Sequence, residues 1–550
     1  MGFGFADRRL EGAALDGILI KGGTVIDGTG SRPVKLDVSI SGTRISGLPR
    51  PGEAKGSMTI NAKGMIVCPG FVDIHTHSEL HLIANPLSES KIRQGVTTEL
   101  TGNCGGSPAP LLGIAREVAS EYARKLELGI DWSTLDEYFL RLSHLRTSVN
   151  VGTLIGAETL RQCVIGNDDV KATDEQQKQM NELLAESILQ GAFGLSSGLI
   201  YAPGCYATTE ELISLASTAG ALGGIYTSHI RGEGGTLVEA VAEAIRIGEM
   251  ANVRVEISHH KATGRPNWGK VKQTLKMIED ARARGVDVGF DVYPYTASST
   301  AVDAILPPWA RDGGKPKILE RLKDPETRAR IADGFKRVTD TFENTVYEDG
   351  WENIVIVGVA GGPNARFENK SIAAIAKELN KDPAETAFDL MLEEDLHVSG
   401  IFHEISEDDM MMVLSHPLAC VGSDGDSESP YGPMGNMTTH PRAYGTFPRV
   451  IRRYCLDKGL FPLEEAIRKM TSLPAARIGL EDRGVLAKGM AADIVVFDPT
   501  KIKDMATYDD SHRYPEGILH VLVNGAVTIE NGEHTKERAG QVLMHKPSVA

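Results

Sequence analysis

Eight short β-rich runs lie in the middle of the chain, and segments with helical periodicity separate several of them. Runs of this length that alternate with helices are typical of parallel strands joined by crossover connections. Eight such repeats predict an α/β protein whose centre is a (β/α)8 TIM-like barrel. A doubly wound open sheet is the alternative, but it accounts less well for the polar residues that end so many runs. The runs are residues 67–77, 97–104, 149–157, 192–201, 224–229, 253–260, 286–295 and 418–424.

Two of the intervening helical segments begin with a capping pattern. Thr173 is followed three residues later by Gln176, and Thr208 is followed at the same spacing by Glu211. In a capping box, the Thr side chain accepts from the backbone N–H three residues on, and the longer side chain bonds back to the cap. Residues 235–250 also carry apolar side chains at helical spacing, so we expect helices between the strands.

Both ends of the chain consist of short β-like runs that Gly and Asp interrupt. Residues 1–69 and 478–550 are each thin for a core of their own. We therefore expect one small β-sandwich built from both termini, with the catalytic barrel over residues 70–477. The seventh and eighth runs lie too far apart for a single crossover. This spacing predicts an inserted, lid-like segment over about residues 300–415, above the barrel mouth.

The composition narrows the classes of partner. Among 550 residues the formal net charge is −16, which disfavours nucleic acid or an anionic membrane surface. No apolar run is long enough to span a bilayer, and residues 1–9 lack the apolar core of a signal peptide. The six cysteines show no paired spacing, so we expect free thiols in a cytoplasmic protein. A homo-oligomer remains an open alternative to a monomer.

Residues at the ends of the runs could bind a metal ion. His75 and His77 are two apart, so on a strand both side chains point to the same side. Active sites of (β/α)8 barrels lie at the carboxyl ends of the strands, where the other runs place Cys104, His229, His259 and Asp424. Thiolate, imidazole and carboxylate groups are typical ligands of Zn²⁺.

Each of these residues also has an ordinary structural explanation. A His-x-His pair can lie on the surface, and a free Cys is most often a small buried apolar residue. His259 and His260 point to opposite faces, and the alternation only weakly favours His259. Asp424 stands before Gly425 and could form a turn. In a metal pocket, however, Asp424 would be the group that transfers a proton from water to the leaving nitrogen.

Taken together, the motifs resemble those of the amidohydrolase superfamily and, more closely, its D-aminoacylase (N-acyl-D-amino-acid deacylase) branch. The resemblance extends over nearly the whole chain, and the combination of motifs is specific. The segments that carry it are residues 69–77, 95–106, 191–203, 228–229, 257–261, 289–300, 423–425, 440–449 and 523–525.

The resemblance implies a barrel, a β-sandwich made from both termini, and a particular arrangement of metal ligands. A tightly bound Zn²⁺ would be held by Cys104, His229 and His259, and a second, weaker position would be lined by His75, His77 and Asp424. Cys104 would take the place of the carboxylated lysine that bridges two metals in many superfamily members. The resemblance also favours His259 over His260.

The resemblance further implies how a substrate is held. The matching positions bind the carboxylate of an acylated D-amino acid; they are Tyr201, Lys261, one of Ser298 or Ser299, and Arg442. Ammonium and guanidinium groups suit this role because they form charge-assisted hydrogen bonds with a carboxylate. Branch members often carry a His before a Thr-Leu-Arg sequence, where this chain has Ala157-Glu158. The acyl preference could therefore differ here.

The expected activity is zinc-dependent hydrolysis of the linear amide bond of a small-molecule N-acyl-D-amino acid, which releases a carboxylic acid and a D-amino acid. Asp424 would serve as the catalytic proton carrier. One alternative keeps the fold but opens a cyclic amide, as hydantoinase-like or dihydroorotase-like relatives do. A non-catalytic scaffold is the other alternative, although such proteins usually lose metal ligands, and this chain keeps every one that the first hypothesis needs.

Overall fold

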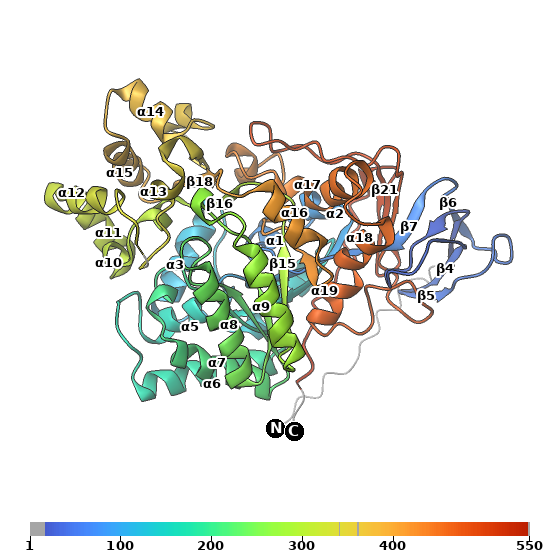
Figure 1. Ribbon diagram of the computed structural model, residues 1–550. Coiled ribbons are helices and arrows are strands. Elements are labelled where there is room, and N and C mark those ends of the chain that lie inside the picture. The colour runs from blue at the N-terminus through green and yellow to red at the C-terminus, as the bar shows by residue number, and fades with distance from the viewer. Residues whose placement is uncertain (1–16, 340, 360–361, 548–550) are drawn as a thin grey trace.

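A computed structural model describes residues 17–339, 341–359 and 362–547 of the chain (Figure 1). The expectation that concerns residues 1–9 lies outside these ranges. Among the helices within them, none combines the length and the apolar character that crossing a bilayer would require.

Eight parallel strand positions form a closed barrel. Neighbours pair in chain order, and a parallel bridge between Thr76 and Gly425 joins the last position to the first. The third position is divided between two short strands, of which one pairs with the second position and the other with the fourth. Every predicted run contains one of these strands, which confirms the barrel. They are β8 (Phe71–Asp73), β9 (Val96–Thr101), β10 (Asn150–Thr153), β11 (Ile155–Gly156), β12 (Gly194–Gly198), β13 (Ile225–His229), β14 (Arg254–Ile257), β15 (Val288–Val292) and β19 (Ala419–Val421).

Helices on the outside of the barrel bury their apolar faces against the strands in one large core. Both predicted caps are present: Thr173 and Gln176 form a reciprocal capping box, and Thr208 accepts from the backbone N–H of Glu211. The long outer helices are α3 (Gly113–Lys125), α4 (Leu135–Leu145), α5 (Ala157–Val164), α6 (Asp174–Leu189), α7 (Thr209–Ala221), α8 (Leu237–Ala251), α9 (Val271–Ala283), α16 (Glu407–Ser415) and α18 (Leu463–Met470).

Removing the first of these caps should loosen the start of α6. Thr173→Ala loses the bond from the Gln176 amide to the Thr173 Oγ1, which spans 3.3 Å. Loss of an N-cap costs about 1 kcal/mol, so hydrogen exchange in the first turn should become about fivefold faster. Lys178→Ala, on the exposed side of the same helix, is the control. Equal exchange in the two variants would mean that the cap contributes nothing.

Strands from both chain ends form two further sheets, which Figure 1 shows beside one another at one side of the barrel. One sheet has the order β5-β4-β1-β6, and the other has the order β23-β22-β21-β20-β7-β2-β3. Apolar residues from both ends share one cluster, which includes Ile18, Val67 and Ile494. The strands are β1 (Ile18–Lys21), β2 (Thr24–Val25), β3 (Val34–Lys35), β4 (Val38–Ser41), β5 (Arg44–Gly47), β6 (Met58–Asn61), β7 (Ile66–Pro69), β20 (Ile494–Phe497), β21 (Ile518–Val523), β22 (Ala526–Glu530) and β23 (Glu533–His534).

The first predicted run contains strands of two different sheets. β7 pairs with β20 and β2 in the sheet of the chain ends, whereas β8 pairs with β9 in the barrel. Gly70 lies between them, and a Cβ there would come within 2.1 Å of Thr97 Oγ1, so only glycine permits this close passage. The domain boundaries at residues 69/70 and 477/478 stay a prediction.

The segment between β15 and β19 has a hydrophobic core of its own. Its antiparallel strands are β16 (Ser298–Ala301), β17 (Ile354–Val357) and β18 (Ser399–Phe402). Its helices, at the upper left of Figure 1, are α10 (Pro308–Arg311), α11 (Gly314–Lys323), α12 (Pro325–Gly334), α13 (Thr345–Asp349), α14 (Ile372–Leu379) and α15 (Pro383–Glu393). α16 packs against α9 and β19 and belongs with the barrel helices, although it lies inside the range predicted for the insertion.

Candidate metal centre and active site

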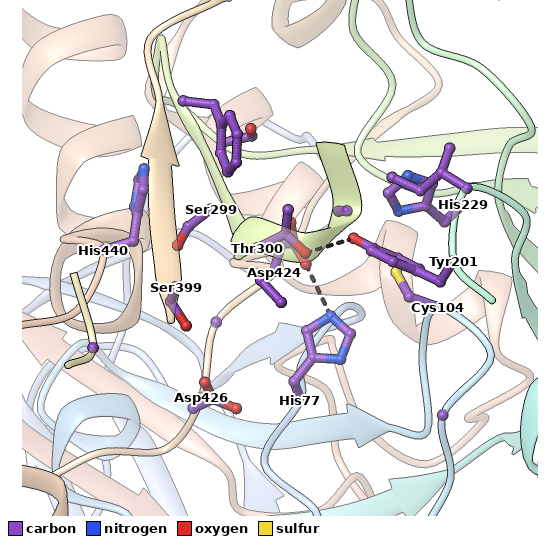
Figure 2. Close-up of a pocket in the computed structure, with 18 of the residues that line it drawn as sticks. His77, Cys104, Tyr201, His229, Ser299, Thr300, Ser399, Asp424, Asp426 and His440 are labelled. Atoms are coloured by element: carbon purple, nitrogen blue, oxygen red, sulfur yellow. Dashed lines mark hydrogen bonds and ion pairs between the residues drawn. The ribbon is translucent and has the colours of Figure 1, made fainter. Parts of the chain in front are cut away.

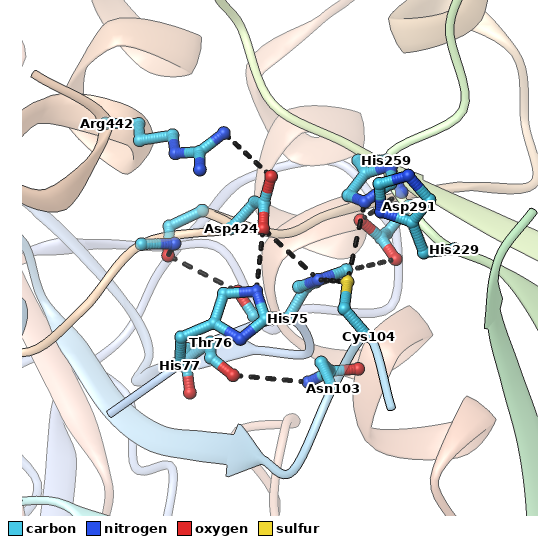
Figure 3. A network of polar contacts seen from close by, with 12 residues as sticks. His75, Thr76, His77, Asn103, Cys104, His229, His259, Asp291, Asp424 and Arg442 are labelled. Carbon is cyan, nitrogen blue, oxygen red and sulfur yellow. Dashed lines mark hydrogen bonds and ion pairs between the residues drawn. The ribbon is translucent and has the colours of Figure 1, made fainter. Parts of the chain in front are cut away.

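Four side chains from separate strand ends converge at the carboxyl end of the barrel. One ligand atom from each of His75, Cys104, His259 and Asp424 lies within 4.8 Å of the others. The Cys104 Sγ is 3.3 Å from His75 Nε2 and 3.6 Å from His259 Nε2 (Figure 3). The convergence follows from the closure of the barrel, because the Asp424 amide donates to the His75 carbonyl across the first and last strands.

Three of these residues hold a backbone conformation that side chains rarely adopt. The φ angles are 49° at Cys104, 34° at His259 and 53° at Asp424. Left-handed conformations at non-glycine residues cost free energy, and they concentrate at functional sites where the surroundings enforce them. Here each one turns a side chain across the barrel mouth just after its strand ends.

His229, at the end of β13, lies beside this group. The centroid of its ring is 4.4 Å from that of His259, and neither ring nitrogen has a hydrogen-bond partner among the described residues, although both are buried. A buried imidazole without a partner is costly unless a ligand satisfies it. His229 forms a second group of possible metal ligands with Glu233 and His259, whose ligand atoms lie within 4.8 Å of one another, and a cation bound there would satisfy His229.

The donor set fits Zn²⁺. Burial keeps the pKa values of His229 and His259 well below their usual range, so both imidazoles are neutral and can act as ligands. Burial also raises the pKa of the Cys104 thiol to about 12, so a cation is needed to hold it as a thiolate. Sulfur and imidazole donors together suit zinc better than magnesium or calcium, which prefer oxygen.

Asp424 lies between the metal-ligand candidates and a buried arginine. His77 Nε2 is 3.0 Å from Asp424 Oδ1, and Arg442 donates to Oδ2 at 2.7 Å. Burial opposes ionisation of this carboxyl, but the charge of Arg442, together with the neighbouring His75 and the hydrogen bond to His77, outweighs it and holds its pKa well below the usual range. Asp424 is therefore ionised and able to accept a proton.

Two acidic residues at the site were not among the sequence predictions. Asp291, on β15, lies 3.2 Å from His75 Nδ1 and accepts from the His259 amide at 2.9 Å. Glu233 lies 2.9 Å from His259 Nδ1. Asp291 could have been found because it lies on a buried strand next to its carboxyl end, whereas Glu233 follows its strand by four residues and gives no such signal.

The residues predicted to bind substrate line a single cavity of about 710 Å³ together with His77, Cys104, His229, His259 and Asp424 (Figure 2). Part of its wall comes from the insertion between β15 and β19. The residues in question are Tyr201, Lys261, Ser298, Ser299 and Arg442. Their assignment to substrate, like that of the metal ligands, stays a prediction.

Several of these groups already have partners. Lys261 donates to Glu233 Oε1 at 2.6 Å, and Ser298 donates to Glu404 at 2.5 Å. The ring of Tyr201 packs edge-on against that of His229, with the ring centroids 5.1 Å apart. A substrate carboxylate must therefore share Lys261 and Arg442 with Glu233 and Asp424.

His260 and Glu158 lie behind the site. The sequence alone left open whether His259 or His260 faces the metal, and what Glu158 does where branch members often carry a His. His260 is 2.9 Å from Thr274 Oγ1 on α9, so it faces the outer helices, and His259 faces the cavity. Glu158 accepts from the Gly198 amide at 2.8 Å, and burial raises its pKa to about 7. Its carboxylate also packs so closely on Gly105 that a Cβ there would collide with it, so Glu158 supports the Cys104 loop from below.

Comparison with known proteins agrees with this geometry. The chain matches the amidohydrolase family over residues 58–529. It is 36% identical to the D-aminoacylase of Alcaligenes xylosoxydans xylosoxydans over 96% of this chain and 97% of that protein. It is 34% identical to the N-acyl-D-glutamate deacylase of the same organism, over 97% of each chain.

Solved structures give the same result. The crystal structure of N-acyl-D-glutamate deacylase from Bordetella bronchiseptica, complexed with zinc and a phosphonate mimic of the tetrahedral intermediate, superposes with a TM-score of 0.81. It is 32% identical, and the match covers 96% of this chain and all of that one. A D-hydantoinase from Thermus sp. shares the fold at 16% identity, with a TM-score of 0.54. The chain belongs to the amidohydrolase family, within its D-aminoacylase branch.

Proposed function

We propose that this protein hydrolyses the amide bond of N-acyl-D-amino acids in a zinc-dependent reaction. One observation supports the proposal: Cys104, His229 and His259 line the same cavity as Arg442 and Lys261. The first three residues fit zinc, and the two cations fit the carboxylate that an N-acyl amino acid retains. The D-configuration is proposed because relatives that are 34–36% identical over nearly the whole chain are named for D-amino-acid substrates.

Zinc at such a site acidifies a water molecule and polarises the carbonyl group of the substrate. Cys104, His229 and His259 would hold the ion, with His75 and His77 beside the second, weaker position. Asp424 would accept the proton of the attacking water, and would then deliver it to the amide nitrogen as that bond breaks.

Arg442 links substrate binding to the basicity of Asp424. In the structure its guanidinium group donates to Asp424. A substrate carboxylate bound to Arg442 would share that positive charge, and Asp424 would become a better proton acceptor because its ionised form would be less stabilised. An acyclic substrate that carries a carboxylate thus fits this site better than a neutral cyclic amide.

A substrate panel tests the proposal. Purified protein, supplied with zinc, is assayed with N-acetyl-D-amino acids, their L-enantiomers and hydantoins, and the released amine or ring-opened product is quantified. We expect hydrolysis of the D-series, with the L-series at least about tenfold slower in kcat/KM, since a reversed centre moves the amide away from Asp424. Turnover of hydantoins alone would instead establish the cyclic-amide alternative.

A further inference from the structure

We propose that Arg311 binds a second anionic group of the substrate, in addition to the carboxylate that Arg442 and Lys261 receive. This inference rests on the proposed function and specifies its substrate class. Arg311 is the last residue of α10 in the insertion, and it lies in the wall of the same cavity as Tyr201 and Cys205. The chemistry recognised would be a carboxylate, either on the amino-acid side chain or on the acyl group.

The lining cations differ in how their charge is compensated. Arg442 pairs with Asp424 at 2.7 Å, Lys261 with Glu233 at 2.6 Å, and Arg231 with Glu243 at 2.9 Å. Lys125 is only half-buried and lies 5.6 Å above the ring of Tyr122. Neither Lys125 nor Arg311 has a carboxylate within ion-pair distance among the described residues, and of these two cations only Arg311 is buried.

Arg311 is also the most completely desolvated cation without a partner. The residue is only 4% exposed, and its Nε is buried with no hydrogen-bond acceptor in the described part of the chain. A guanidinium group carries five N–H donors in a fixed fork that matches a carboxylate. Leaving such a charge buried and unpaired is strongly unfavourable. A ligand that supplies two oxygens would remove much of this unfavourable free energy when it binds.

The position of Arg311 is fixed by its neighbours. Tyr206 Oη donates to the carbonyl of Pro308 at the start of α10, and Arg321 donates to the carbonyl of Ala310 at its end. Asp303 lies near enough for Arg311 to lower its pKa, although burial has the larger, opposite effect. The backbone of α10 is therefore held in place beside the cavity.

Residues close together in the chain line the cavity from the Arg442 contact to α10. Ser299, whose carbonyl accepts from Arg442, is followed by Thr300, Ile305 and Arg311, and all four line the cavity. Thr300 donates to the Tyr201 hydroxyl at 3.1 Å, and Ile305 supplies an apolar surface along this path. A substrate with a short aliphatic spacer between its two carboxylates would match this pattern. The relatives do not decide the point, since the D-aminoacylase and the two deacylases named for N-acyl-D-glutamate and N-acyl-D-aspartate are all 34–36% identical to this chain.

The test compares charged substrates with neutral isosteres. N-acetyl-D-glutamate against N-acetyl-D-glutamine probes a side-chain carboxylate, and N-succinyl-D-alanine against N-succinamyl-D-alanine probes one on the acyl group. In the wild-type protein we expect kcat/KM to favour the charged member of one pair by at least about tenfold, mostly through KM. The pair that shows the preference identifies which part of the substrate meets Arg311.

Variants assign that preference to the residue. Arg311→Met should bring the charged-to-neutral ratio close to one, and Arg311→Lys should retain part of it because a positive charge remains. Lys125→Met removes a different cation from the same cavity and should keep the wild-type ratio. Because the readout is a ratio within one preparation, partial misfolding of a variant does not change it.

Two results would overturn the inference: a wild-type ratio near one in both pairs, or an Arg311→Met variant that keeps the wild-type ratio. Either can occur while neutral N-acyl-D-amino acids are hydrolysed, in which case the proposed function stands. If no substrate is turned over, calorimetric binding of N-acetyl-D-glutamate and N-acetyl-D-glutamine to zinc-loaded protein decides instead. The two N-succinyl compounds are compared in the same way, and equal binding within both pairs by wild-type protein would then count against Arg311.

Discussion

Replacement of Asp424 by asparagine is expected to lower turnover by about 10²–10⁴-fold, the range that a positioned acid–base group contributes. The amide keeps the size of the side chain and can still accept a bond from Arg442, which now donates to Oδ2 at 2.7 Å. It cannot take up a proton at neutral pH, so both the attack of water and the departure of the amine lose their proton carrier. Zinc content should persist, because Cys104, His229 and His259 are unchanged.

Asp426→Asn is the matched control for this variant. Asp426 lines the same cavity two residues further on, but it pairs with His81 at 3.4 Å and touches no metal-ligand candidate. Steady-state kinetics with an N-acetyl-D-amino acid, together with zinc analysis, compares the two variants. Turnover of Asp424→Asn that equals that of Asp426→Asn would remove the proton-carrying role.

The second large effect concerns the metal. Cys104→Ala should weaken zinc binding by more than about 100-fold. Loss of a residue that only hydrogen-bonds to a metal ligand weakens binding by at most about that factor, and loss of a ligand itself should have a larger effect. Among the described residues, Cys104 is the only cysteine in the groups of possible metal ligands, and its Sγ is 3.6 Å or less from a ring nitrogen of both His75 and His259. Elemental analysis after dialysis should therefore find substoichiometric zinc and correspondingly low turnover.

Cys205→Ala provides the comparison for the metal experiment. Cys205 also lines the cavity and is a free thiol, but it does not belong to the clusters of metal-ligand candidates. This variant should keep the wild-type zinc content after the same dialysis. A Cys104→Ala protein that retains a full equivalent of zinc would exclude the thiolate from the ligand set.

Local sequence patterns account for most of the barrel. Each barrel strand lies in a short β-rich stretch that glycine or polar residues end, so each left a visible signal, and the caps at Thr173 and Thr208 marked two helices. The pattern failed at Gly70, because β7 and β8 form one apolar stretch and only long-range pairing assigns them to different sheets. The extent of the insertion was equally hidden, since an amphipathic helix such as α16 does not reveal which core it packs against.

The site was predictable as far as strand ends determine it. His75, Cys104, His229, His259 and Asp424 could be named because the barrel brings the carboxyl ends of its strands together. Glu233 and Arg311 could not be found in this way, because they lie in loops and in the insertion. The roles of Glu233 and Arg311 depend on where tertiary packing places their charges, and residue spacing in the sequence does not predict this placement.

Activity measured against added zinc tests the central claim most directly. The protein is stripped with a chelator, dialysed, and assayed with an N-acetyl-D-amino acid as zinc is restored in fractions of an equivalent. We expect negligible turnover in the stripped protein and a rise that approaches its maximum near the first equivalent, as a single tightly held ion at Cys104, His229 and His259 requires. Full turnover in metal-free protein, or no turnover at any zinc level with any N-acyl-D-amino acid, would contradict the account.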